Sequence, residues 1–176
     1  MKNDTNPWVN VDFPDVIACR EKYIPRGERE KNVVCDITDH RWFDEVPFEK
    51  EKGVIFLAAG VLYYFTTDQV RALLCAMAER FPGGVVAFDA VNRIGLKAMA
   101  KTVLSQTGMS DIDAYFSVGD APRELSAWSD AFASVTARSY MSGYRRLGIR
   151  YGLLPAVLNW FADHLVRMSI VRVAFR

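Results

Sequence analysis

The chain has 176 residues, 51% of them hydrophobic, which is long enough for one substantial core and short for two full domains. Its 22 Lys and Arg stand against 21 Asp and Glu, a balance that disfavours a nucleic-acid partner. No apolar leader opens the chain, and charges interrupt its last apolar stretch, so we expect neither a secretory signal nor a membrane partner. We therefore expect one domain over residues 1–176, located in the cytoplasm.

The three cysteines, Cys19, Cys35 and Cys75, are widely spaced and form no C-x-x-C pair. This pattern favours free thiols in a reducing compartment and argues against a metal site, because a structural zinc needs its ligands clustered.

Short β-rich runs alternate with helical patterns, which is typical of a parallel sheet with crossover helices. Residues 8–12 predict a first strand, and Pro14 opens a helix that reaches about Tyr23. Residues 32–37 predict a second strand. Residues 53–59 form a continuous apolar run, which predicts a third strand in a sheet covered on both faces.

The clearest helix follows, with apolar residues at helical spacing between Val70 and Phe81 and a capping box formed by Thr66 and Gln69. Residues 85–89 predict a fourth strand, and a further helix is expected from about Ile94 to Thr107.

The C-terminal part changes character. Residues 135–141 and 169–175 predict two strands that bracket a helix starting near Pro155, and these late strands could form an antiparallel edge on the sheet. The helix is expected to bury four apolar side chains: Val157, Leu158, Phe161 and Leu165.

Ligands of open α/β sheets bind beyond the carboxyl ends of the strands, which draws attention to Asp12, Asp36 and Asp89. A carboxylate at such a position can accept hydrogen bonds from both ribose hydroxyls. Asp12 fits this role, but it could equally cap the following helix. Asp36 could instead form an Asx turn with the residues after it.

Several familiar motifs are absent, among them G-x-G-x-x-G, G-x-x-x-x-G-K-[ST], G-x-S-x-G and H-E-x-x-H. A P-loop nucleotidase, a serine hydrolase of the elbow type and a zincin are therefore disfavoured. A nicotinamide-dependent reductase shares the sheet, but the sequence also lacks a Tyr-x-x-x-Lys pair.

Four ordered segments together carry a family resemblance. Residues 8–17 resemble W-x-x-V-D-x-P-x-V-I, residues 36–42 resemble D-[VI]-T-D-x-x-W, and residues 59–65 resemble E-G-V-L-M-Y-L. Residues 80–84 with 88–89 match the helix end and strand that follow. Over residues 8–92 the chain thus resembles the leucine carboxyl methyltransferase and tetracenomycin-type polyketide O-methyltransferase family.

The resemblance implies a Rossmann-like α/β S-adenosylmethionine methyltransferase sheet, mostly parallel with an antiparallel C-terminal strand. It implies S-adenosylmethionine as cofactor and methyl transfer to an oxygen of a small phenolic, enolic or carboxylic acceptor, as in polyketide biosynthesis. By position, the cofactor-binding residues would be Asp12 for the ribose, Asp36 and Ile37 for the adenine, and Ala58, Ala59 and Gly60 for the methionine part. Tyr64 would stand near the substrate pocket. The general base is unassigned, with His40, Tyr64 and Asp89 as candidates on chemistry alone.

The chain departs from the family pattern at two points. Ala59 stands where many members carry Glu, and the family's first strand with its glycine-containing loop is missing before residue 8. That strand would lie centrally, so its loss predicts two unpaired strand edges, poor cofactor binding by the chain alone and a homodimer as one way to fill the gap. The alternative function is a catalytically inactive methyltransferase-like remnant that acts as a binding or oligomerisation module.

Overall fold

A computed structural model describes residues 5–99, 101, 115–141 and 152–176 of the chain. The chain divides into two compact units, Met1–Lys52 and Gly53–Arg176, and each is described by itself. The expectation of a single incomplete domain stays a prediction.

The first unit contains a parallel pair of strands, β1 (Trp8–Asp12) and β2 (Glu30–Val34), joined by α1 (Pro14–Tyr23). Pro14 occupies the first helical turn, as the sequence predicted, and Arg20 of α1 pairs with Glu30 of β2 at 3.3 Å. The pairing register begins at Trp8 opposite Glu30. The second strand therefore starts two residues earlier than its apolar residues indicated, because its polar first half also pairs with β1. It ends at Val34 and not at the predicted residue 37.

A 3-10 helix, η1 (His40–Glu45), closes the first unit. It buries Trp42 and Phe43, whose rings meet edge to face with centroids 4.6 Å apart. Asp39 caps its N-terminus, accepting from the backbone N–H of Arg41, and the Arg41 side chain holds the pKa of Asp39 below its usual value.

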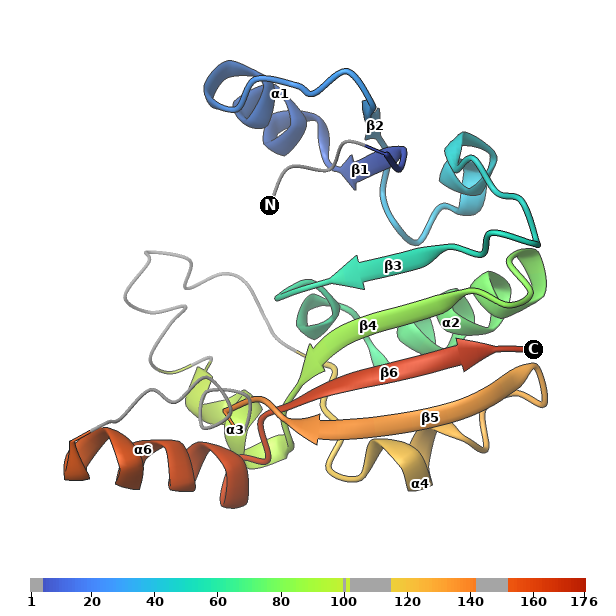
Figure 1. Ribbon diagram of the computed structural model, residues 1–176. Helices are drawn as coiled ribbons and strands as arrows, with labels where there is room; N and C mark the ends of the chain where they lie inside the picture. The colour runs from blue at the N-terminus through green and yellow to red at the C-terminus, as the bar shows by residue number, and fades with distance from the viewer. Residues whose placement is uncertain (1–4, 100, 102–114, 142–151) are drawn as a thin grey trace. The chain divides into compact units, whose positions relative to one another are not determined.

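The second unit is built on a four-stranded sheet in the order β3-β4-β6-β5, visible in Figure 1. The strands are β3 (Ile55–Ala58), β4 (Val85–Ala90), β5 (Phe132–Ser139) and β6 (Ser169–Phe175). The pair β3–β4 is parallel, whereas β6 is antiparallel to both β4 and β5. The predicted antiparallel edge of two late strands is confirmed, since β6 and β5 pair antiparallel at one end of the sheet order. The first of them, β5, starts three residues before the predicted 135–141 and ends two residues earlier.

The helices of this unit are α2 (Thr67–Arg80), α3 (Arg93–Met99), α4 (Ala121–Leu125) and α6 (Leu153–His164), with a short 3-10 turn, η2 (Leu62–Tyr64). The predicted capping box of α2 is confirmed, since the Thr66 side chain accepts from Gln69 N–H and the Gln69 side chain accepts from Thr66 N–H. The predicted extension of α3 to Thr107 lies outside the described residues.

One face of the four-stranded sheet carries the core. Its buried members on the strands, at alternate positions, and at the end of α2 are Phe81, Val86, Phe88, Val171, Val173 and Phe175. The opposite face is open in the described part of the chain, where Ile55 is 71% and Leu57 62% exposed. The expectation that the third strand is covered on both faces is therefore wrong for this part, where only Phe56 and Ala58 of β3 are even half-buried.

The apolar face of α6 is likewise uncovered. Val157, Leu158, Phe161 and Leu165 are exposed rather than buried, so the helix was predicted correctly and its burial was not. Helical spacing identifies an apolar stripe but not the surface that covers it. None of the described helices is both long enough and apolar enough to cross a membrane.

Close packing fixes α3 at Gly95. A Cβ at this position would lie 2.9 Å from the Cβ atoms of both Val91 and Val166. We expect Gly95→Ala to lower the free energy of unfolding by about 1–3 kcal/mol through overpacking. Helix propensity alone predicts the opposite sign, a gain of about 1 kcal/mol. Urea denaturation would decide between them, with the exposed Lys97→Ala on the same helix as control. A stabilised Gly95→Ala protein would contradict the packing argument.

Candidate functional site

The carboxyl ends of β1 and β2 hold the first group of predicted site residues. Asp12 lies opposite Val34 at the end of the parallel pair, and the next residue, Cys35, donates its N–H to the Asp12 carbonyl at 3.0 Å. Asp12 is half-buried, and its Oδ1 accepts from Phe13 N–H at 2.9 Å. The N-cap of α1 is Phe13, with no side-chain cap bond, so Asp12 is not the helix cap. Its Oδ2 has no protein donor among the described residues.

Asp36 lies two residues beyond β2 and is exposed. Its Oδ1 accepts from both the N–H and the hydroxyl of Thr38, each at 2.8 Å, which is the Asx-turn geometry that the sequence left open. The next residue, Ile37, is half-buried, and its carbonyl accepts from the Trp42 indole N–H at 2.9 Å. Trp42 thus fixes the backbone next to Asp36.

The carboxyl ends of β3 and β4 hold the second group. Ala58 ends β3, and the exposed Ala59 and Gly60 follow it. Gly60 has φ +70°, a conformation that favours glycine, and an added Cβ would meet no atom within 4 Å. Open space therefore lies beside this turn. Tyr64, four residues further on, is 41% exposed.

Asp89 of β4 joins the second group. Its Oδ1 accepts from Gly60 N–H at 2.6 Å, and its Oδ2 accepts from the Tyr63 hydroxyl at 3.0 Å. Both oxygens are engaged by donors, which disfavours Asp89 as the general base. His40, the third base candidate, is an exposed residue of the first unit, stacked on Phe43 with ring centroids 4.9 Å apart. The six predicted cofactor-binding residues thus form two groups, each at the carboxyl ends of its own parallel pair.

Tyr63 is a residue of this network that the sequence analysis did not single out. It is 3% exposed, and burial together with the nearby Asp89 carboxylate raises its pKa above the ordinary value. The hydroxyl therefore stays protonated and donates to Asp89. Its position after the end of β3 was the one feature of the sequence that could have indicated a role. Its hydrogen-bond partner, Asp89, lies 26 residues away and could not be inferred from local pattern.

The raised pKa of Tyr63 makes stability depend on alkaline pH. The unfolded chain releases this proton near its ordinary pKa of about 10, whereas the folded chain retains it, so stability is full below that pH and falls above it. At pH 11 the ionisation of this tyrosine in the unfolded chain should lower the free energy of unfolding by about 1 kcal/mol. Tyr63→Phe should remove this component, and urea unfolding of both proteins at pH 8 and pH 11 measures it. Equal pH dependence in the two proteins would refute the assignment.

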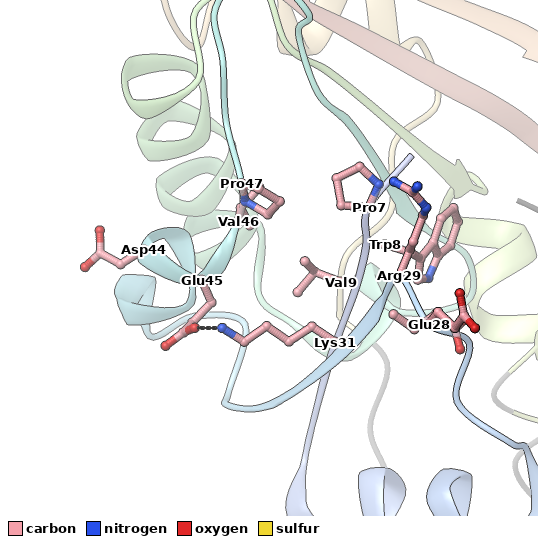
Figure 2. Close-up of a pocket in the computed structure, with 11 residues that line it drawn as sticks. Pro7, Trp8, Val9, Glu28, Arg29, Lys31, Asp44, Glu45, Val46 and Pro47 are labelled. Atoms are coloured by element: carbon pink, nitrogen blue, oxygen red, sulfur yellow. Dashed lines mark hydrogen bonds and ion pairs between the residues drawn. The ribbon is translucent and has the colours of Figure 1, made fainter. Parts of the chain in front are cut away.

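Figure 2 shows a hollow of about 460 Å³ in the first unit, and none of the predicted site residues lines it. It is lined by the first residues of β1 and β2, among them Trp8 and Glu30, and by the end of η1, where Lys31 pairs with Glu45. It lies at the amino ends of the strands, opposite to where ligands of parallel sheets bind. We therefore do not assign the cofactor to it. In the described ranges, no three His, Cys, Asp or Glu side chains lie where they could hold a metal ion.

The fold is that of solved methyltransferases, one of them in complex with SAM. Human N-acetylserotonin methyltransferase, solved in complex with SAM, superposes with a TM-score of 0.54 at 13% identity, over 95% of this chain and 40% of that one. A DUF574 family protein from Streptomyces avermitilis gives a TM-score of 0.59 at 11% identity, over 96% and 64% of the two chains.

The sequence has particular relatives within this class. It is 31% identical over 88 residues to the tetracenomycin polyketide synthesis O-methyltransferase TcmP of Streptomyces glaucescens, covering 50% of this chain and 32% of TcmP. It is 27% identical over 164 residues to the S-adenosyl-L-methionine-dependent methyltransferase dpfgK of Gibberella zeae, covering 89% of this chain and 54% of dpfgK. No family model matches. The predicted family resemblance is confirmed, and the chain spans about half or less of the length of these relatives.

Proposed function

We propose that this chain is the S-adenosylmethionine-binding part of an O-methyltransferase that acts on a small phenolic, enolic or carboxylic acceptor. The observation that carries the proposal is the position of the candidate residues at the carboxyl ends of both parallel pairs, where ligands of this fold bind. The homology with TcmP and dpfgK supports the same chemistry. Single-domain organisation over residues 1–176 is part of this proposal.

The described residues fit such a cofactor. Asp12 retains a carboxylate oxygen without a protein donor, which suits a ribose hydroxyl. The turn at Gly60 presents exposed backbone beside open space, which suits the amino-acid part of the ligand. Asp36 and Ile37 would contact the adenine, and Tyr64 would stand at the acceptor pocket. When bound, the cofactor supplies an electrophilic methyl group on its sulfonium.

The residues of this chain would act by alignment. Methyl transfer is an in-line displacement, so holding donor and acceptor in one geometry is the main contribution that a protein makes. Ala59, in place of the family's Glu, leaves an apolar wall beside Gly60. Tyr64, which is exposed, is the side chain that we assign to acceptor contact.

Calorimetric titration of the chain with S-adenosylmethionine and S-adenosylhomocysteine tests the proposal. We expect saturable but weak binding of both, in line with the strand and glycine loop that the family pattern has before residue 8, and methyl transfer from labelled S-adenosylmethionine to at least one acceptor in a panel of phenols, enols and carboxylic acids. No heat at millimolar ligand would contradict cofactor binding by this chain. Binding without transfer to any acceptor would favour the inactive remnant instead.

We also propose that a second copy of the chain pairs with the free edge of β3. In the described residues β3 pairs with β4 alone, and its exposed face carries Ile55 and Leu57. Two such edges paired antiparallel about a two-fold axis centred on Phe56 would set Ile55 of each copy beside Leu57 of the other. Light scattering after size exclusion should show a dimer that Leu57→Lys converts to monomer. A monomeric wild-type chain would overturn this proposal.

A further inference from the structure

The carboxylate of Asp89 links the ends of two neighbouring strands. It accepts from Gly60, 29 residues away in sequence, at 2.6 Å, and from Tyr63, 26 residues away, at 3.0 Å. Both donors belong to the connection between β3 and α2, whereas Asp89 belongs to β4. One side chain therefore holds this connection at two points.

Gly60 is the residue of this turn whose backbone conformation requires an external contact to fix it. Its φ of +70° is a left-handed conformation, and no neighbour within 4 Å of an added Cβ enforces it by crowding. The Asp89 bond is charge-assisted, and such bonds are roughly twice as strong as neutral ones. The hydrogen bond, rather than packing, therefore fixes the orientation of this peptide.

Tyr63 extends the same network to a third segment. Its side chain is buried, and its carbonyl accepts from Tyr115 N–H at 2.7 Å and Phe116 N–H at 3.3 Å. Val118 N–H in turn donates to the Val91 carbonyl at 2.9 Å, just beyond β4. Asp89 therefore lies where three segments are joined by hydrogen bonds: β4, the connection between β3 and α2, and residues 115–118.

We propose that Asp89 is a positioning residue, which orients the exposed backbone of Ala58, Ala59 and Gly60 to receive the amino-acid part of S-adenosylmethionine. It acts through the Gly60 peptide and does not contact the acceptor. The inference rests on the proposed function, because it assigns a ligand to the turn.

The test compares two ligands that share the nucleoside but differ in the amino-acid part. Asp89→Ala should weaken S-adenosylhomocysteine by about tenfold or more, the effect of one lost hydrogen bond to a charged group. Its affinity for 5′-methylthioadenosine, which lacks the amino and carboxyl groups, should stay within about twofold of wild type. Asp89→Asn keeps an acceptor for Gly60 N–H and should largely restore binding of S-adenosylhomocysteine.

Asp120→Ala is the matched control, because it also removes a carboxylate that accepts a backbone N–H, here Arg123 at 3.2 Å at the start of α4. It should change neither affinity. Equal losses for both ligands in Asp89→Ala, or no loss, would overturn the proposal. If Asp89→Ala does not fold, Gly60→Ala takes its place, since it disfavours the same turn by its φ value and should show the same ligand selectivity.

Amide exchange at Gly60 separates this inference from the proposed function. In the ligand-free protein this amide should exchange about tenfold or more faster in Asp89→Ala than in wild type, and only slightly faster in Tyr63→Phe. A wild-type chain that binds no S-adenosylhomocysteine would refute the proposed function. Equal Gly60 exchange in wild type and Asp89→Ala would refute the positioning role.

Discussion

Replacement of Phe81 by alanine is expected to lower the free energy of unfolding by about 3–5 kcal/mol, the usual cost of removing a fully buried aromatic ring. Phe81 is 0% exposed and follows directly on the end of α2. Its ring centroid lies 5.0 Å from that of Phe56 on β3. Its backbone carbonyl also accepts from Gly84 N–H at 2.9 Å, at the start of β4. The residue therefore joins α2 to both parallel strands.

Urea denaturation followed by far-ultraviolet circular dichroism measures this effect. Ile94→Ala is the control, because Ile94 lies on α3 of the same unit and is 55% exposed, so its loss should stay within about 0.5 kcal/mol. Similar losses for the two variants would show that the face bearing Phe81 is not the core of the second unit.

Elements with a strong periodic signal were predicted well. The capping box at Thr66 and the apolar spacing up to Phe81 place α2 almost to the residue, and the last strand matches β6 at both ends. The start of β2 was missed because Glu30 and Lys31 are polar, and only their pairing with β1 makes them strand residues. The helix α4 was missed because its five residues are too few for a period, although Asp120 before Pro122 was a usable start signal.

Some residues of the candidate site could likewise be predicted from the sequence, and others could not. Asp12 could be proposed from the sequence because it ends a predicted strand, where ligands of such sheets bind, and Gly60 because it follows a predicted strand and matches the family pattern. The role of Asp89 could not, since the sequence offered it only as an acid at a strand end and as a candidate general base. Its actual partners, Gly60 and Tyr63, are fixed by the parallel pairing of β3 and β4. Contacts between residues so far apart follow from topology and not from local pattern.

Removal of the Asp12 carboxylate is expected to have the largest effect on ligand binding. If its two oxygens accept from the ribose hydroxyls, Asp12→Ala loses two hydrogen bonds to a charged group and should weaken S-adenosylhomocysteine about 100-fold. The fold should tolerate the change, because α1 is capped without this side chain and Oδ1 bonds only the adjacent Phe13 N–H. Calorimetry on the full chain measures the affinity, with Asp15→Ala as control, since Asp15 is an exposed carboxylate three positions along.

The ligand series gives Asp12 a signature of its own. S-adenosylhomocysteine and 5′-methylthioadenosine carry the same ribose hydroxyls, so Asp12→Ala should weaken both equally, whereas Asp89→Ala should weaken only the former. Wild-type affinity in Asp12→Ala would show that this carboxylate serves the Phe13 turn alone. Equal losses in Asp12→Ala and Asp15→Ala would point instead to the general negative charge near α1. Comparing the two ligands therefore distinguishes a ribose contact, expected for Asp12, from an effect on the turn that receives the amino-acid part, expected for Asp89.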